Sequence, residues 1–156
     1  MMTKMIFDGD CITGGTKVKN AILDKIIKSR KPVTVIHGVA GSGKSTTATE
    51  DGSQVINADT NLAKATEFVV ISGASATVSG EPSKAVSTLF KRAKNVVFVI
   101  PSNFEIMRRR QNRVQVGAID NRSEKQVKAT LRAPLNNFSF VAKLRKLAKK
   151  SQIVSN

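Results

Sequence analysis

Short continuous runs of apolar residues alternate along the chain with stretches in which apolar residues recur every three or four positions. The continuous runs predict buried strands over residues 4–7, 33–37, 55–57, 68–72 and 96–100. The longer periodicity, with its start and stop signals, predicts helices over residues 17–29, 44–49, 82–94, 103–112, 123–131 and 139–150. This alternation predicts an α/β fold in which helices flank a mostly parallel sheet on both faces.

The length of 156 residues indicates a single compact domain. Within 1–156 we expect an N-terminal extension over 1–31, a core over 32–140, and a basic C-terminal helix and tail over 141–156. The lone cysteine excludes an internal disulfide. No apolar run reaches the length of a membrane span and the N-terminus lacks the apolar region of a signal peptide, so we expect a soluble, cytoplasmic protein without a membrane partner.

The formal net charge of +15 is distributed unevenly. Residues 1–60 carry 8 basic and 6 acidic side chains, whereas residues 61–156 carry 18 and 5. Such an excess of positive charge indicates an anionic partner. The candidates are a triphosphate, a phosphorylated substrate, nucleic acid or an acidic protein. The alternative is a basic surface that only contacts solvent. Residues 108–150, with thirteen basic and two acidic side chains, are the candidate nucleic-acid-binding region. No aromatic residues lie between the C-terminal lysines, so base stacking is not expected there.

The stretch that follows the strand over 33–37 matches the phosphate-binding pattern G-x-x-x-x-G-K-[ST], also called Walker A. In this pattern backbone N–H groups surround a phosphate, Lys44 reaches the β- and γ-phosphates, and the Ser45 hydroxyl ligates Mg²⁺. The pattern therefore predicts that ATP or GTP binds with Mg²⁺. The candidate nucleotide-binding residues are Gly38, Val39, Ala40, Gly41, Ser42, Gly43, Lys44, Ser45 and Thr46.

Asp59, at the end of the short run over 55–57, is a candidate catalytic base or metal ligand. Its other interpretation is a turn or a helix cap, because Asp-Thr-Asn is typical capping sequence. The run over 68–72 ends in Ser72, where an ordinary NTPase would carry an aspartate, and the chain contains no Asp-Glu pair. This absence argues against a motor ATPase or a helicase.

The arginines of the helix predicted over 103–112 are candidates for a phosphate clamp. Arg109 and Arg113 share a face at i, i+4, and guanidinium groups offer paired, permanently charged donors to phosphoryl oxygens. The alternatives are a solvated basic face or a nucleic-acid patch. Arg122 and Arg132 flank the next predicted helix and are weaker candidates for the same clamp.

Other polar residues have simpler interpretations. His37, the sole histidine, ends a buried strand and is expected to be a packed, hydrogen-bonded core residue. Asp8 and Asp10 lie beside Cys11 as a metal site would require, but Asp-Gly-Asp before Thr-Gly-Gly favours a turn.

The order of these motifs resembles that of the small P-loop kinases, namely shikimate- and gluconate-kinase-like enzymes, zeta-toxin-like kinases and polynucleotide 5′-kinases. The resemblance rests on the loop, on Val-Ile-Asn-Ala-Asp59, on Phe-Val-Val-Ile-Ser-Gly73, on Val-Val-Phe-Val-Ile-Pro101 and on the arginine-rich helix. It implies a three-layer P-loop NTPase-like fold. It also implies that Asp59 contacts or deprotonates the acceptor hydroxyl, and that Arg109, Arg110 and Arg113 belong to a lid over the phosphates.

Two departures from these kinases concern the acceptor. The helix after the loop is short, and only ten residues separate Ala58 from Val69, where the kinases insert an acceptor-binding segment. Residues 32–46 also resemble the first motif of viral RNA helicases.

These observations predict a small P-loop kinase that transfers the γ-phosphoryl group to a hydroxyl of nucleic acid, a nucleotide or a small molecule. Lys44, Asp59, Arg109 and Arg113 are its candidate catalytic residues, and Ser45 and Asp59 its candidate metal ligands. The alternatives are a nucleic-acid-associated or self-assembling nucleotide-binding protein with little or no catalysis, and a degenerate viral helicase-like NTPase domain. The sequence is compatible with an oligomer.

Overall fold

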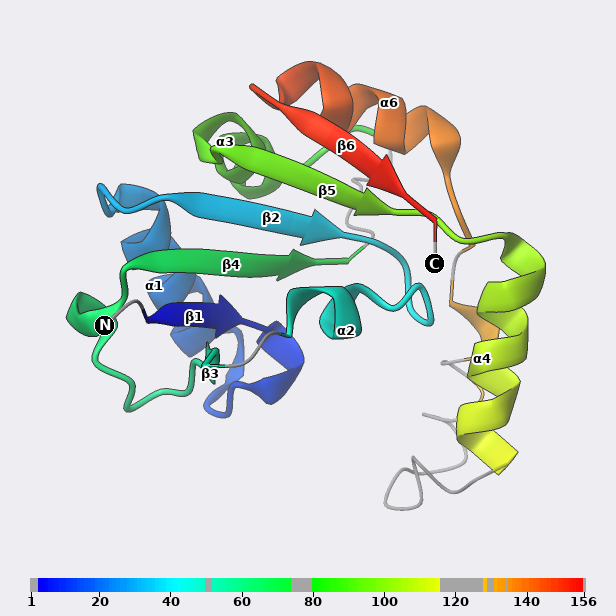
Figure 1. Cartoon of the computed structure of the whole chain (residues 1–156), viewed down its shortest axis with the longest axis horizontal. Helices are drawn as coiled ribbons and strands as arrows, with labels where there is room; N and C mark the ends of the chain where they lie inside the picture. The colour runs from blue at the N-terminus through cyan, green and yellow to red at the C-terminus, as the bar shows by residue number, and fades with distance from the viewer. Residues whose placement is uncertain are drawn as a thin grey trace.

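The fold is built on a six-stranded sheet in which every pair of neighbouring strands is parallel. A computed structural model describes residues 3–49, 52–73, 80–115, 128, 131–133 and 135–155. The strand order is β3-β1-β4-β2-β5-β6 (Figure 1). The strands are β1 (Lys4–Phe7), β2 (Val33–His37), β3 (Gln54–Val55), β4 (Glu67–Ser72), β5 (Asn95–Val99) and β6 (Ser151–Val154).

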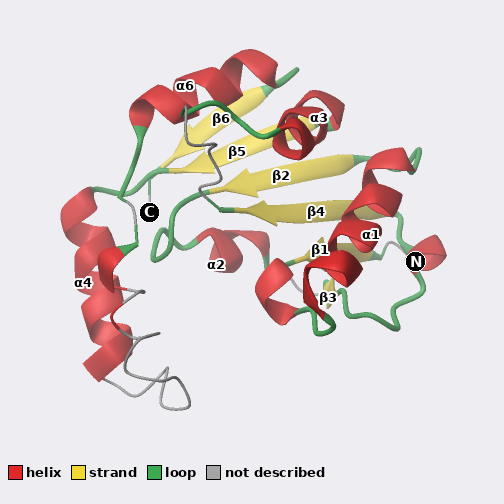
Figure 2. Ribbon diagram, turned by 180° about the vertical axis from the view of Figure 1, so that it is seen from behind, coloured by secondary structure: helices red, strands yellow, loops and turns green. Residues whose placement is uncertain are grey.

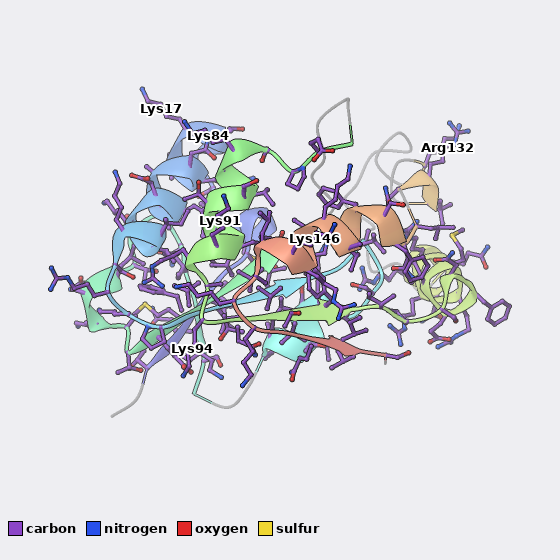
Figure 3. All side chains as sticks on the ribbon, turned by 90° about the horizontal axis from the view of Figure 1, so that it is seen from above. Lys17, Lys84, Lys91, Lys94, Arg132 and Lys146 are labelled. Carbon is purple, nitrogen blue, oxygen red and sulfur yellow. The ribbon has the colours of Figure 1, made fainter. Side chains whose placement is uncertain are left out.

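Helices cover both faces of the sheet, but unequally (Figures 2 and 3). The helices are α1 (Gly15–Lys28), α2 (Lys44–Ala48), α3 (Lys84–Arg92), α4 (Asn103–Gln115) and α6 (Phe138–Leu147), with short 3₁₀ turns at Gly9–Cys11 and Leu62–Lys64. Three of them, α1, α3 and α6, lie side by side on one face, whereas α2 lies on the other. Helix α4 lies beyond the carboxyl ends of the strands.

The direction of each crossover explains this distribution. The connections through α1, α3 and α6 all move across the sheet in one direction, from β1 to β2, from β4 to β5 and from β5 to β6. The connection through α2 moves the opposite way, from β2 to the edge strand β3. Because crossovers between parallel strands are right-handed, a reversal of direction places the helix on the opposite face.

The larger part of the core lies under the three helices. Phe68, Phe90 and Phe98 are buried there with Ile26 of α1 and Leu144 of α6, among others. A smaller cluster on the α2 face joins Ile6, Ile36, Val69, Val97 and Ala48. Strand β2 lies between β4 and β5 and contributes to both clusters, so its carboxyl end is held in a fixed place.

Polar side chains fix the ends of the helices. The Ser83 hydroxyl accepts a hydrogen bond from Val86 N–H, and the Asn137 side chain accepts one from Phe140 N–H, so α3 and α6 each begin at an N-cap. Arg92, in the last turn of α3, donates to the backbone carbonyls of Ile27, Ser29 and Lys31. This contact ties α3 to the segment that leads into β2.

Most of the predicted elements are confirmed to within a few residues. The sheet is entirely rather than mostly parallel, and the helix predicted over 82–94 is shorter because Ser83 caps it. The predicted helix over 123–131 falls almost entirely outside the described residues. Among the described residues, no helix is both long enough and apolar enough to cross a membrane.

Two predictions about the ends of the chain are corrected. Residues 1–31 are not an appendage to the sheet, because β1 is an internal strand between β3 and β4. The C-terminal helix ends at Leu147 rather than near residue 150, and the expected tail forms β6, which pairs with β5 from Val96↔Ser151 to Val99↔Val154. Both segments complete a single sheet, as one compact domain requires.

Candidate functional site

The candidate site lies at the carboxyl end of β2, where the loop over residues 38–43 leads into α2. The helix that follows β2, α2, lies on one face of the sheet, whereas α3, which follows the neighbouring strand β4, lies on the other. Such a reversal opens a crevice at the carboxyl edge, which is where open α/β sheets bind ligands. The strand order therefore places the predicted phosphate-binding loop at the crevice.

The loop is compact and closely packed. Gly38 N–H donates to the Ser72 carbonyl of β4 at 3.1 Å, and a Cβ atom on Gly38 would lie 2.3 Å from the Ser42 Oγ, so no larger residue fits there. Gly43, at the N-cap of α2, has a φ of 87°, which favours glycine. The Ser42 side chain is fully buried, and its Oγ has no hydrogen-bond partner among the described residues.

Lys44 reaches back into this loop. Its Nζ donates to the Gly38 carbonyl at 3.0 Å, so the ammonium group lies beside the loop backbone rather than in solvent. A Cβ atom built on Gly73 would lie 3.5 Å from the same Nζ, which places the lysine between the ends of β2 and β4. The predicted phosphate-binding lysine thus occupies the centre of the crevice.

Helix α4 supports the loop from the side through Arg110. The Arg110 side chain is fully buried, its Nε donates to the Ala40 carbonyl at 2.8 Å, and its guanidinium also donates to the Ala133 carbonyl at 2.6 Å. Burial, together with the neighbouring charge of Arg113, lowers the pKa of Arg110 from its ordinary value. This arginine fixes the backbone of the loop against α4 and the segment around residue 133.

Arg109 makes a second contact with the loop. Its guanidinium donates to the Ser42 carbonyl at 3.1 Å and, at 3.4 Å, to the Gly41 carbonyl, while its Nε donates to Glu105 at 3.0 Å. Glu105 also accepts from Arg108 one turn away. These hydrogen bonds, with Arg108 the stronger partner, lower the pKa of Glu105 to about 2.

A cleft of about 520 Å³ separates the start of α2 from α4. Arg113 lines it and makes no hydrogen bond or ion pair with the described residues. The walls consist of residues from the two helices: Gly43, Thr46, Thr47, Arg108, Arg109, Asn112 and Arg113. The volume falls within the range of ordinary small-molecule sites, about 300–1,000 Å³. The structure thus brings the predicted clamp residues Arg109 and Arg113 next to the loop.

His37 is confirmed as a packed, hydrogen-bonded residue of the core. Its ring is 4% exposed, makes edge-on contacts with Phe90 and Phe98, and lies 3.1 Å from the Ser72 Oγ through Nδ1. Burial, and secondarily the charge of Lys44, lowers the pKa of His37 to about 4. The imidazole is therefore neutral at neutral pH, and Ser72, where an NTPase aspartate was expected, is held by this histidine.

The low pKa of His37 predicts a specific loss of stability in mild acid. The unfolded chain binds a proton on His37 near pH 6.5, whereas the folded chain does so only near pH 4, so the unfolding free energy falls as the pH decreases between these values. The loss amounts to at most about 3 kcal/mol. Denaturant titrations at a series of pH values measure it. In His37→Gln, which removes the only histidine, the slope between pH 6.5 and 4.5 is expected to flatten.

The structure does not bring Asp59 to the loop. Two strands, β1 and β4, separate β3 from β2, which amounts to about 14 Å across the sheet. Asp59 is exposed in a turn, where its N–H donates to the Asn57 side chain at 2.9 Å. This placement favours the turn interpretation; the roles of Asp59 as a base and as a metal ligand remain predictions without support from the geometry.

Within the candidate nucleic-acid region over 108–150, the described cations do not all face one side. Arg109 and Arg110 face the loop, and Lys143 of α6 forms an ion pair with Glu81 at 2.6 Å. Arg122 lies outside the described residues, whereas Arg132 is exposed.

The residues present fit a phosphate ligand better than they fit a metal ion by itself. The loop supplies backbone donors, Lys44 and Arg113 supply positive charge, and the orphaned Ser42 hydroxyl indicates a polar interior. For Mg²⁺ the loop offers the exposed Ser45 hydroxyl. No cluster of metal-ligating side chains occurs among the residues that the structure describes. A magnesium ion here would depend on phosphate oxygens and water for its other ligands, as is usual for this ion.

Comparisons with protein-family models, with curated proteins and with solved structures gave no match to this chain.

Three features of the site escaped the sequence analysis. The first is the contact of Arg110 with the Ala40 carbonyl, which joins residues seventy positions apart and leaves no local signal. The second is the lining of the cleft by Thr47, Arg108 and Asn112. The third is the pairing of Glu105 with both Arg108 and Arg109, which the i, i+3 and i, i+4 spacing could have predicted.

Proposed function

We propose that this chain is a P-loop protein that binds a nucleoside triphosphate, ATP or GTP, together with Mg²⁺. One observation carries the proposal: the loop over 38–46 lies at the carboxyl end of the central strand, with Lys44 folded into it and an arginine-lined cleft directly beside it. Strand, loop, lysine and cleft are the parts that such a site needs.

The charge of the site suits a triphosphate. Lys44 supplies a cation within the loop, and Arg113 faces the cleft without a carboxylate partner among the described residues. Helix α2 has only five residues, so its dipole contributes less than a longer helix would. The side-chain cations and the loop N–H groups therefore supply most of the expected attraction, and the cleft has room for the rest of the nucleotide.

We further propose that the reaction available to this site is transfer of the γ-phosphoryl group, as in the small P-loop kinases that the sequence resembles. Phosphoryl transfer depends chiefly on positioning and on neutralising charge, which Lys44 and Arg113 would provide. The positions of Asp59 and Ser72 argue for slow turnover, because neither places a carboxylate at the end of β4. Nucleotide binding is therefore the primary function in this proposal.

Isothermal titration with ATP and with GTP, each with and without Mg²⁺, tests the proposal. We expect saturable binding of a triphosphate to the wild-type protein. The variant Arg113→Gln should weaken this binding about tenfold, the equivalent of about 1.4 kcal/mol for one lost charged contact. The matched control is Asp59→Asn, which removes an exposed charge outside the site and should leave the affinity unchanged. The proposal fails if neither nucleotide binds, and the clamp role of Arg113 fails if the two variants behave alike.

A further inference from the structure

The helices on one face of the sheet carry most of their charge as lysine and arginine. Helices α1, α3 and α6 together hold ten basic residues and one acidic residue, Asp24, which is paired with Lys28 at 2.9 Å. On the opposite face, α2 has a single charged residue, Lys44, which belongs to the nucleotide site. Of the helices on the two faces of the sheet, those on the α1, α3 and α6 face therefore carry the larger positive charge, in addition to the arginines of α4 beside the proposed nucleotide site.

Some of these cations are engaged within the fold. Arg92 is turned toward backbone carbonyls at the end of α1, and Lys143 pairs with Glu81. Six others are exposed, and their side chains make no hydrogen bond or ion pair with the described residues: besides Lys25 and Arg145, these are four lysines, namely Lys17 of α1, Lys84 and Lys91 of α3, and Lys146 of α6. We call these four lysines the helical basic face. Figure 3 labels them on the layer of three helices.

The spacing of the helical basic face suits an extended polyanion. Lys84 and Lys91 are seven residues apart, so they lie on the same side of α3 and are separated by about 10 Å along its axis. Lys17 and Lys146 extend the charge to the helices on either side of α3. Packed helices lie 8–10 Å apart, so the three span about 16–20 Å. A layer of this width is broad enough to face both phosphate backbones beside a groove about 12 Å wide.

The chemistry of this face distinguishes nucleic acid from a membrane. Membrane-binding helices expose Leu, Phe or Trp along one side. Here the apolar sides of α1, α3 and α6 are buried against the sheet, and Phe138, at the start of α6, is the one large apolar residue of these described helices that is exposed. The face also lacks the aromatic platform on which single strands stack their bases.

We propose that the helical basic face binds a nucleic-acid duplex through its phosphate backbones, without reading the base sequence. The inference relocates the nucleic-acid contact from the segment 108–150 to three helices, two of which lie outside that segment. It does not depend on nucleotide binding, because none of the four lysines lines the cleft or the loop.

The test compares two variants with the same loss of charge. The first, Lys84→Gln/Lys91→Gln/Lys146→Gln, removes three lysines of the helical basic face. The second, Arg30→Gln/Lys64→Gln/Lys94→Gln, removes three exposed cations outside the three helices. They lie shortly before β2, β4 and β5, near the amino ends of these strands. Fluorescence anisotropy measures the affinity of each full-length protein for a 20-base-pair duplex of RNA and for a DNA duplex of the same sequence, at several salt concentrations.

We expect the wild-type protein to bind at least one duplex at low salt, and the RNA and DNA arms identify which. Each phosphate contact contributes about 0.9 to the slope of log affinity against log salt, so the first variant should lose about 2–3 from that slope and at least tenfold in affinity at low salt. The second variant should change both quantities much less. Melting curves check that both variants fold, and the single variants Lys84→Gln and Lys94→Gln replace any triple variant that does not.

Three results would overturn the proposal. One is the absence of duplex binding at low salt, and another is an equal loss in the two triple variants, which would indicate attraction by net charge alone. The third is binding to vesicles of phosphatidylserine and phosphatidylcholine that exceeds binding to either duplex. None of these results would argue against the proposed nucleotide site, which is tested separately. Titration of the first variant with ATP or GTP should give the same affinity as the wild type.

Discussion

Replacing Lys44 with alanine is expected to lower the affinity for the proposed nucleoside triphosphate by about 100-fold or more, because an ammonium–phosphate hydrogen bond is charge-assisted and Lys44 would make more than one in the proposed complex. The fold should survive, since Lys44 is half-exposed and its described hydrogen bond ends on the Gly38 carbonyl of the same loop. Isothermal titration with ATP or GTP and Mg²⁺ measures the loss, and circular dichroism melting measures the stability.

The matched control for this variant is Lys64→Ala, which removes an exposed lysine just before the start of β4, at the end of that strand away from the loop. Its affinity should equal that of the wild type. A second consequence concerns His37, whose pKa is lowered partly by the charge of Lys44. In Lys44→Ala that pKa should rise, so the acid-induced loss of stability should still begin near pH 6.5 but should be slightly smaller and should end at a higher pH. Equal nucleotide affinity in Lys44→Ala and Lys64→Ala would contradict the proposed site.

The parts of the fold that the sequence predicted are those with strong local signals. The runs over 33–37, 68–72 and 96–100 are continuous and apolar because these strands are buried on both faces, between helices. The loop pattern is a run of nine residues whose backbone geometry depends on its own glycines and on the strand before it. Such features need no knowledge of distant residues.

The parts that the sequence did not predict depend on long-range pairing. Strand β6 has four residues, two of them exposed, and no alternation that separates it from a tail. Asp59 follows a short strand as expected, but only the strand order shows that β1 and β4 lie between it and the loop. Likewise, the i, i+4 spacing put Arg109 and Arg113 on one face without showing that Arg110 is the arginine buried against the loop.

Arg110 is a fully buried residue of α4 whose loss should lower the stability of the fold. In Arg110→Met the side chain keeps an apolar stem but leaves the carbonyls of Ala40 and Ala133 without its donors. A buried acceptor without a partner costs about 1–3 kcal/mol, so the two together should lower the unfolding free energy by about 2–6 kcal/mol. Part of this cost is offset, because the variant no longer has to bury a charged guanidinium away from water. The unfavourable effect of that burial is visible in the lowered pKa of Arg110.

The same substitution should also weaken nucleotide binding, because Arg110 fixes the position of Ala40 within the loop. Arg108→Met is the matched control for stability: it lies on the same helix, its side chain is 59% exposed, and its described partner is Glu105 of the same helix. Because Arg108 also lines the cleft, nucleotide binding by Arg110→Met is compared with that of the wild type instead. Exposed ion pairs of this kind contribute at most about 1 kcal/mol, so the control should unfold nearly as the wild type does. Denaturant unfolding and ATP titration of the two variants measure both effects. If Arg110→Met is as stable as Arg108→Met and binds the nucleotide as tightly as the wild type does, the loop does not depend on α4 for its shape, and the arginine contact is incidental.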